Sequence, residues 1–163
     1  MKHYDARSYS VQDSIGYLMR RGASLMRDQL DAAFAGHDFT FVQWATLMLV
    51  RENPALTPGD LCRDLRHDSG AFTRILDHLE ARGLLRRERS DEDRRVVQLR
   101  VTAEGRRVVN SLLPVVVEQL NDALADFTAE EVAMLAKLLR RLIARLQATA
   151  AVNADPHRRV AKP

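Results

Sequence analysis

Apolar residues recur at helical spacing along the first part of the chain. Between residues 14 and 34 most gaps between apolar positions are three or four, the pattern of a helix with one buried face. A nearly continuous apolar run over residues 40–52 predicts a second helix that is buried on several sides and ends at Asn53-Pro54. The N-terminal part is therefore expected to be helical.

The next segment carries two helix starts close together. Thr57, Pro58 and Asp60 supply an N-cap oxygen, an N1 proline and an acid in the first turn, so a short helix is expected to run from there to about residue 67. Asp68 or Ser69 then begins a helix that ends at residue 83 with a glycine. Its buried face follows the spacing i, i+3, i+4, i+7: Phe72, Ile75, Leu76 and Leu79.

The period of the pattern then changes from helix to strand. Residues 84–89 and the alternating residues 97–101 predict two strands, joined by the polar turn 90–93. Thr102 is an N-cap for a helix over residues 103–125, in which Pro114 predicts a kink. A capping box at residues 128–131 begins a last helix.

Composition and charge narrow the class of protein. Hydrophobic residues are 46% and charged residues 29% of the 163-residue chain, an ordinary globular balance. The net charge is only +3, and the basic residues are almost all arginines, which suit phosphate and carboxylate contacts. The polar N-terminus lacks a signal-peptide core and no apolar run is long enough to span a bilayer, so a cytoplasmic protein without membrane contact is expected.

The order of elements from residue 57 to residue 101 is that of a helix-turn-helix followed by a two-stranded wing. The exposed face of the second helix carries small and hydrogen-bonding residues that suit the major groove of DNA, and two arginines near the hairpin tip suit the minor groove. One or more of the strand arginines Arg86, Arg87 and Arg89 is expected to contact phosphate, whereas Asp77 is expected to form an ion pair on the helix surface. The predicted DNA contacts are Ser69, Gly70, Ala71, Thr73, Arg74, His78, Arg86, Arg94 and Arg95.

Residues 56–105 resemble the winged helix-turn-helix core of the MarR-type bacterial transcriptional regulators. The resemblance rests on the stretch TRILDHLEARGLL and on the wing pattern Asp93-Arg94-Arg95, and with the flanking helices it covers about residues 12–148. It implies that Asp93 orients Arg95 for the minor groove and that helices from both chain ends form a two-fold homodimer. The implied function is a ligand-responsive regulator, more specifically a repressor that binds a pseudo-palindromic double-stranded operator and is associated with the nucleoid.

The resemblance also implies a cleft for a small aromatic acid or phenol between the dimerisation helices and the winged domain. The candidate ligand residues are Tyr17, Arg20, Phe41, Trp44, Met48 and Arg87, with Arg20, Arg21 or Arg87 paired to the carboxylate. Aromatic and methionine side chains at such positions are more often core than pocket. Both interpretations of these residues stay open at the level of sequence.

Two alternatives compete with the ligand-responsive regulator. One is a redox-responsive regulator of the same fold that uses the single cysteine, Cys62, although a structural thiol is favoured at that position. The other is a winged-helix module that binds proteins and not DNA. An enzyme is not expected, because no nucleophile arrangement, phosphate loop or metal set is visible, and neither a cofactor nor a metal is predicted.

The expected fold is mainly α with a small β-hairpin wing, a winged helix-turn-helix core with a helical dimerisation region. N-terminal helices of dimerisation and scaffold are expected over residues 12–54, and the DNA-binding core over residues 55–102. The C-terminal dimerisation helices are expected over residues 103–150, followed by a disordered tail over residues 151–163.

Overall fold

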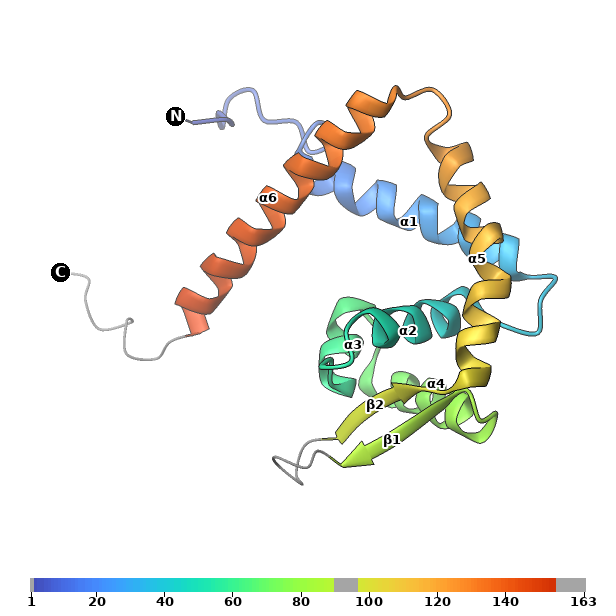
Figure 1. Ribbon diagram of the computed structural model, residues 1–163. Coiled ribbons are helices and arrows are strands. Elements are labelled where there is room, and N and C mark those ends of the chain that lie inside the picture. Colours follow the sequence, from blue (N-terminus) through green and yellow to red (C-terminus); the bar gives the residue numbers. More distant parts are fainter. Residues whose placement is uncertain (1, 90–96, 155–163) are drawn as a thin grey trace. The chain divides into compact units, whose positions relative to one another are not determined.

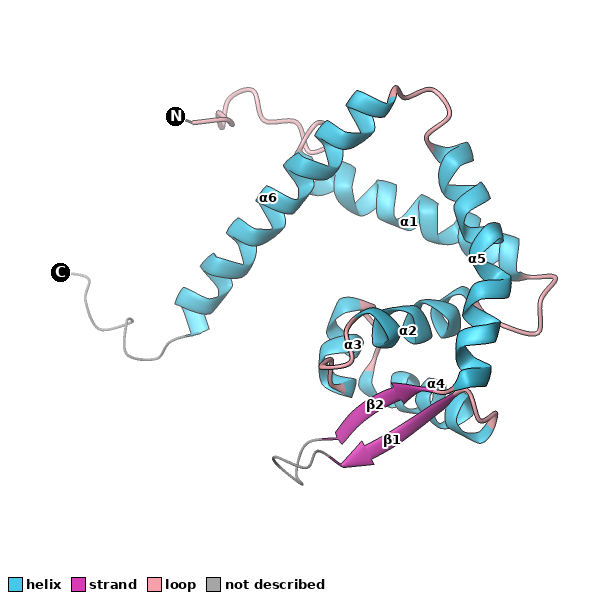
Figure 2. Cartoon of the chain, in the orientation of Figure 1, coloured by secondary structure: helices cyan, strands magenta, loops and turns pink. Residues whose placement is uncertain are grey.

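A computed structural model of the protein describes residues 2–89 and 97–154 (Figure 1). The described residues form six helices and two strands, coloured by type in Figure 2. In chain order these are α1 (Ile15–Phe34), α2 (Phe41–Glu52), α3 (Pro58–Asp64), α4 (Ser69–Ala81), β1 (Leu85–Arg89), β2 (Val97–Val101), α5 (Ala103–Ala123) and α6 (Ala129–Ala154). The chain divides into two compact units, Met1–Ala123 and Leu124–Pro163. The fold is mainly helical with one antiparallel hairpin, as the sequence predicts.

Capping side chains begin the helices where the sequence predicts them. Thr40 forms a capping box with Gln43, and Thr57 forms one with Asp60. Of the two residues proposed to begin α4, the N-cap is Asp68, whose carboxylate accepts hydrogen bonds from two backbone N–H groups of the first turn. Each cap satisfies donors that the first turn of a helix leaves without a partner. Residues within one turn of each helix start therefore determine where these helices begin.

The C-terminal helices differ from the prediction at their ends. α5 stays helical on both sides of Pro114 and ends at Ala123, two residues before the predicted end at residue 125. α6 begins after a capping box in which Thr128 and Glu131 exchange hydrogen bonds. It continues to Ala154, beyond the boundary expected at residue 150, and the rest of the predicted tail lies outside the described residues.

Hydrogen bonds and close packing join the base of the hairpin to the start of α5. Thr102 donates through its backbone N–H to the oxygen of Leu84 and through its hydroxyl to the oxygen of Gly83. A Cβ atom at Gly105 would lie 2.1 Å from that Leu84 oxygen, so only a glycine lets α5 approach so closely. Gly83 itself has a φ of +68°, the left-handed conformation that ends α4 and turns the chain into β1.

A single hydrophobic core joins all elements of the first unit. In the hairpin Leu85 pairs with Val101 and Arg87 with Leu99, and the two leucines are fully buried. In Figure 1 the hairpin lies beside α4, and α2 lies between the hairpin and α1. Every element contributes at least one buried apolar side chain: Leu30, Phe34, Leu47, Val50, Leu61, Phe72, Leu76, Leu79, Leu85, Leu99 and Val109. This core fixes α4 and the hairpin as one rigid surface.

The second unit contains α6, which leaves large apolar side chains in contact with solvent. These side chains are 43–56% exposed: Met134, Leu135, Leu138, Ile143 and Leu146. Solvent exposure of so many apolar residues on one helix is unusual for a monomeric soluble protein. Over the described part of the chain, no helix combines the length and apolar character needed to cross a membrane.

Candidate nucleic-acid interface

α4 divides into a buried face and an exposed face as the sequence predicts. Phe72, Leu76 and Leu79 are buried in the core, and Ile75 is half-buried against it. The opposite face presents the residues proposed to reach DNA, all of them exposed: Ser69, Gly70, Ala71, Thr73, Arg74 and His78. The core therefore holds the helix by one side and leaves the other side free for a partner.

The first turn of α4 is small and tightly closed. The Asp68 carboxylate accepts from the N–H groups of Gly70 and Ala71, at 2.9 and 3.1 Å. A Cβ atom at Gly70 would come within 3.2 Å of that carboxylate, a tight contact. The hydroxyl of Thr73 donates to the oxygen of Ser69, which leaves its methyl group as the outward contact. A small surface of this kind allows a close approach to a duplex.

Arg74 is the cationic group of this exposed face. It lies one turn after the start of α4, and among the described residues it makes no ion pair. Within the described part of the chain, nothing therefore competes with an outside partner for its guanidinium by an ion pair. An arginine at this position of a recognition helix can form a bidentate contact with guanine.

One face of the hairpin carries alternating charges. Arg86 and Arg100 both lie near the carboxylate of Glu88, at 4.0 and 3.7 Å, and all three side chains are substantially exposed. Ion pairs this exposed are weak, so both arginines can turn to a phosphate. Arg89, which follows at the end of β1, is exposed as well. The proposed wing residues Asp93, Arg94 and Arg95 lie outside the described residues.

Arg87 forms ion pairs within its own chain. Its guanidinium bridges two carboxylates of α4, with Nη2 2.7 Å from Asp77 and Nη1 2.6 Å from Glu80. Burial lowers the pKa of Arg87, but the hydrogen bonds to Asp77 and Glu80 outweigh it and hold the pKa above its ordinary value. Arg87, one of several candidates for contact with a phosphate or a ligand carboxylate, therefore binds two carboxylates of its own chain. Asp77 is an ion-pair partner, as predicted.

The remaining proposed ligand residues lie in two separate groups, one on α1 and one on α2. Tyr17 and Arg20 lie together on α1, with the guanidinium 5.5 Å from the ring centre. Phe41 and Trp44 stack on α2, and Trp44 is buried in the core with its indole N–H bonded to the oxygen of Val109. Met48 is half-buried there, and its sulfur contacts a guanidinium nitrogen of Arg51. Trp44 is therefore a core residue.

Two hollows along α1 nevertheless each contain one of these residues, Arg20 in the first and Phe41 in the second. The first, of about 680 Å³, is lined by Gly16, Met19, Arg20, Ala23, Ser24, Arg27 and Arg66. The second, of about 90 Å³, is lined by Arg27, Asp31, Phe41, Val42, Leu65 and His67. Arg27 lies in both, so Arg20 and Phe41 belong to adjoining hollows. The sequence interpretation missed Arg27 and Arg66. The two residues are far apart in the sequence, and only the tertiary fold brings Arg66 beside α1.

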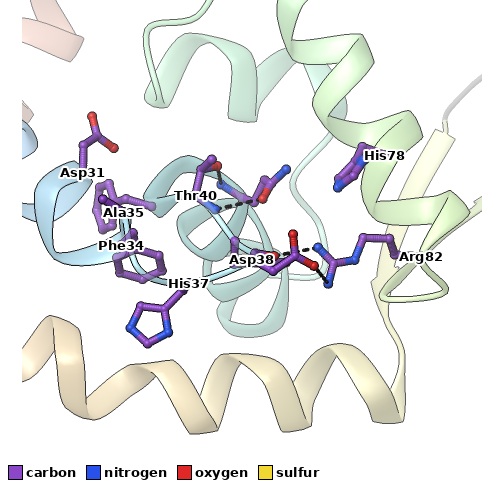
Figure 3. A pocket seen from close by; sticks show the side chains of 11 residues that line it. Asp31, Phe34, Ala35, His37, Asp38, Thr40, His78 and Arg82 are labelled. Atoms are coloured by element: carbon purple, nitrogen blue, oxygen red, sulfur yellow. Dashed lines mark hydrogen bonds and ion pairs between the residues drawn. The ribbon is translucent and has the colours of Figure 1, made fainter.

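A third hollow reaches the C-terminal end of α4 (Figure 3). It has a volume of about 460 Å³, and His78 of α4 and Arg82, the C-cap of that helix, line it together with the α1–α2 loop. Arg82 extends to Asp38, donating to its backbone oxygen at 2.8 Å and approaching its carboxylate at 3.3 Å. The guanidinium also lies 5.4 Å from the ring centre of Phe39. Arg82 thus connects α4 to the loop beyond α1.

Cys62 is held by the turn between α3 and α4. Its Sγ atom donates to the backbone oxygen of His67 at 3.0 Å, and the side chain is half-buried. This contact gives the thiol a structural role in the helix-turn-helix. Within residues 2–89 and 97–154, no group of three or more His, Cys, Asp or Glu side chains could hold a metal ion.

Known proteins share both this sequence pattern and this fold. A family model described as the MarR family matches residues 37–96. The HTH-type transcriptional regulator PecS of Dickeya dadantii is 33% identical over 132 residues, which cover 78% of each protein. The multiple antibiotic resistance protein MarR of Escherichia coli is 33% identical over 107 residues, 65% of this chain and 74% of MarR.

Solved structures agree with the sequence relatives. The crystal structure of wild-type apo MarR from E. coli has a TM-score of 0.67 and 28% identity, covering 79% of this chain and 96% of MarR. BpsR of Bordetella bronchiseptica, whose DNA binding is regulated by 6-hydroxynicotinic acid, has a TM-score of 0.68 at 22% identity, covering 82% of this chain and 96% of BpsR. From its sequence relatives, the chain belongs to the MarR family of transcriptional regulators.

Proposed function

We propose that this chain is a sequence-specific DNA-binding repressor that reads the major groove with α4. The observation that carries the proposal is the exposed face of α4, small at its first turn and followed by Arg74 without an intramolecular ion pair among the described residues. The proposed contacts are Ser69, Gly70, Ala71, Thr73, Arg74 and His78 from α4 and Arg86 from β1. This function implies a cytoplasmic, nucleoid-associated protein.

The repressor acts as a homodimer in this proposal. Exposed apolar side chains on α1, among them Ile15, Leu18 and Leu25, and those described above on α6 supply surface for a second copy. Two-fold symmetry with one recognition helix per subunit gives a pseudo-palindromic operator, with half-sites about 34 Å apart. Arg94 and Arg95 of the wing add minor-groove contacts in this proposal, with Asp93 orienting Arg95.

A small aromatic acid regulates the repressor in this proposal. Arg20, Arg27 and Arg66 line the larger hollow along α1, and no carboxylate is among the residues lining it. The adjoining hollow offers the ring of Phe41 as an apolar surface. Arg27 lines both hollows, so a carboxylate held by the arginines of the larger hollow could carry a planar ring that extends toward Phe41. The regulation of BpsR by 6-hydroxynicotinic acid is consistent with this ligand class.

A selection experiment tests the DNA-binding proposal. The full chain is used to select duplexes from a random pool, and affinity is then measured on the selected duplex and on a scrambled one. We expect Arg74→Ala to cost about 1–3 kcal/mol on the selected duplex and to relax the preference at one base-pair position. Arg107→Ala is the matched control, because Arg107 is an exposed arginine of α5 already paired with Glu104.

Two results would contradict the proposal. A wild-type chain that enriches no sequence would favour the alternative of a protein-binding winged helix. An Arg74→Ala variant with unchanged affinity and unchanged preference would show that α4 does not read bases through this residue.

A further inference from the structure

Arg87 occupies the two carboxylates that α4 presents beside its DNA-reading face. Nη2 lies 2.7 Å from Asp77 Oδ1, Nη1 lies 2.6 Å from Glu80 Oε2, and the backbone N–H of Arg87 donates to Glu80 Oε1 at 3.1 Å. The Arg87 side chain is 28% exposed, whereas that of Asp77 is 58% exposed. One side chain of β1 therefore neutralises two acids of the helix.

Asp77 has a second potential partner on its own helix. Arg74 lies three residues before Asp77, and both side chains are on the exposed face of α4. Residues three apart on a helix are neighbours, and opposite charges at this spacing attract. The chain forms such pairs in two other helices, between Asp60 and Arg63 in α3 and between Glu104 and Arg107 in α5.

The described part of the chain contains no equivalent pair between Arg74 and Asp77. Two features distinguish the pairs that form: in both of them the acid precedes the arginine, the more favourable order on a helix, and among the described residues neither acid is bound by an arginine of a strand, as Asp77 is by Arg87. Over residues 2–89 and 97–154, Arg74 thus makes no ion pair while Asp77 is bound to Arg87. An arginine suits this task because its planar guanidinium presents separate N–H groups in a fixed geometry, one nitrogen to each carboxylate.

We propose that Arg87 is a positioning residue for base reading, which keeps Arg74 available to DNA by binding Asp77. This inference rests on the proposed DNA-binding function. Bound to Arg87, Asp77 neither pairs with Arg74 nor presents an uncompensated negative charge to the phosphates. Without Arg87, the acid competes with the base for Arg74 and repels the duplex.

The test uses a double substitution with the full-length chain. Arg87→Gln frees Asp77, and we expect it to weaken binding to the selected duplex roughly tenfold, the size of one lost arginine–base contact. The loss on a scrambled duplex is expected to be smaller, because no base contact is at stake there. Adding Asp77→Asn to Arg87→Gln removes the competing acid and is expected to restore affinity to within about twofold of wild type.

A purely structural role for Arg87 gives the opposite pattern. If Arg87 only braces β1 against α4, removing Asp77 as well leaves binding as weak as in Arg87→Gln or weaker, and this result would overturn the proposal. The single variant Asp77→Asn tests the same point even if Arg87→Gln folds poorly. We expect it to bind the selected duplex at least as well as wild type, and a severalfold loss would contradict the inference.

A control and a prior measurement separate this inference from the function on which it rests. Arg107→Gln removes the same charge from an i, i+3 pair in α5 and is expected to leave the affinity unchanged. A wild-type chain that selects no duplex would overturn the proposed function itself. A wild-type chain that selects one, with all Arg87 and Asp77 variants binding alike, would overturn only the role given to Arg87.

Discussion

The indole Nε1 of Trp44 donates a hydrogen bond to the backbone oxygen of Val109 over 3.0 Å. The two residues lie on α2 and α5, and both are buried. The indole ring stacks with Phe41, and its centre lies 6.4 Å from the ring centre of Phe34 of α1. Three helices therefore meet at this side chain. Trp44 therefore holds α2, which supports the winged core, to the long helix that leaves it.

Replacing Trp44 by Phe should lower stability without changing DNA recognition. The variant loses one buried hydrogen bond and part of the packed ring, at a cost of about 1–3 kcal/mol in the free energy of unfolding. Chemical denaturation followed by circular dichroism measures the loss. Tyr9→Phe, at an exposed aromatic residue, is the control and should leave stability unchanged. A Trp44→Phe chain as stable as wild type would show that the indole contact is dispensable.

Gly105 and Gly22 should respond in opposite directions to alanine. At Gly105 the added Cβ would lie 2.1 Å from the Leu84 oxygen and 2.8 Å from a methyl of Val101, so α5 must move away from the hairpin. We expect a loss of about 1–3 kcal/mol. Gly22 lies inside α1 with nothing within 4 Å of a new Cβ, so alanine should stabilise by about 0.5–1 kcal/mol. Thermal unfolding of both variants checks the opposite signs.

The elements of the fold could be predicted because their signals are local. Thr57 with Asp60 and Thr128 with Glu131 are three residues apart, and each pair forms the predicted cap. The alternation over residues 97–101 likewise predicts β2. The caps need no knowledge of the tertiary structure, since both partners lie within one turn, and the strand is visible in the alternation of neighbouring residues.

The functional surface was only partly predictable because its contacts join distant segments. The exposed face of α4 follows from helical spacing, and the structure agrees with it. Arg87, by contrast, binds two acids of another element, and Arg82 reaches Asp38, which is 44 residues away in the chain. No local pattern tells an arginine that binds its own chain from one free for a ligand. Packing likewise placed Trp44 in the core.

Acid should weaken the helix-turn-helix through Asp60. The Thr57 hydroxyl and, next in effect, the Thr57 backbone N–H donate to its carboxylate and lower the pKa of Asp60 below its ordinary value of 3.8. A carboxyl whose pKa is lowered by folding stabilises the native state above the unfolded pKa, and this is lost as the pH falls through the folded value. Asp60→Asn should therefore lower the melting temperature at neutral pH, and the difference from wild type should shrink in acid. An equal difference at both pH values would contradict this assignment.

Disrupting the apolar side chains of α6 should dissociate the proposed dimer. Leu135 and Leu138 are 43% and 44% exposed, so a charged residue at either position costs much less in a monomer than in an apolar interface. Light scattering should give twice the 18.5 kDa chain mass for wild type and the single mass for a Leu135→Glu, Leu138→Glu variant. Lys137→Gln, at an exposed neighbouring position, should remain dimeric. A wild-type monomer at micromolar concentration would contradict the dimer.

Arginines of the larger α1 hollow should set the response to aromatic acids. Arg27 and Arg66 line it, and Arg66 has a φ of +51°, so Asn is the substitution that keeps its backbone conformation with least strain. A ligand that binds only the folded chain raises the melting temperature. Benzoic acid and 6-hydroxynicotinic acid should do so in wild type, and Arg27→Gln and Arg66→Asn should each reduce the rise.

Arg21→Gln is the matched control, because Arg21 lies on α1 but is not among the residues that line the hollow. Benzamide, which has the ring but no charge, should have little effect on any of these proteins. An equal rise in wild type and in both hollow variants would show that the acids bind elsewhere, and an equal response to benzamide would show that the carboxylate is not recognised.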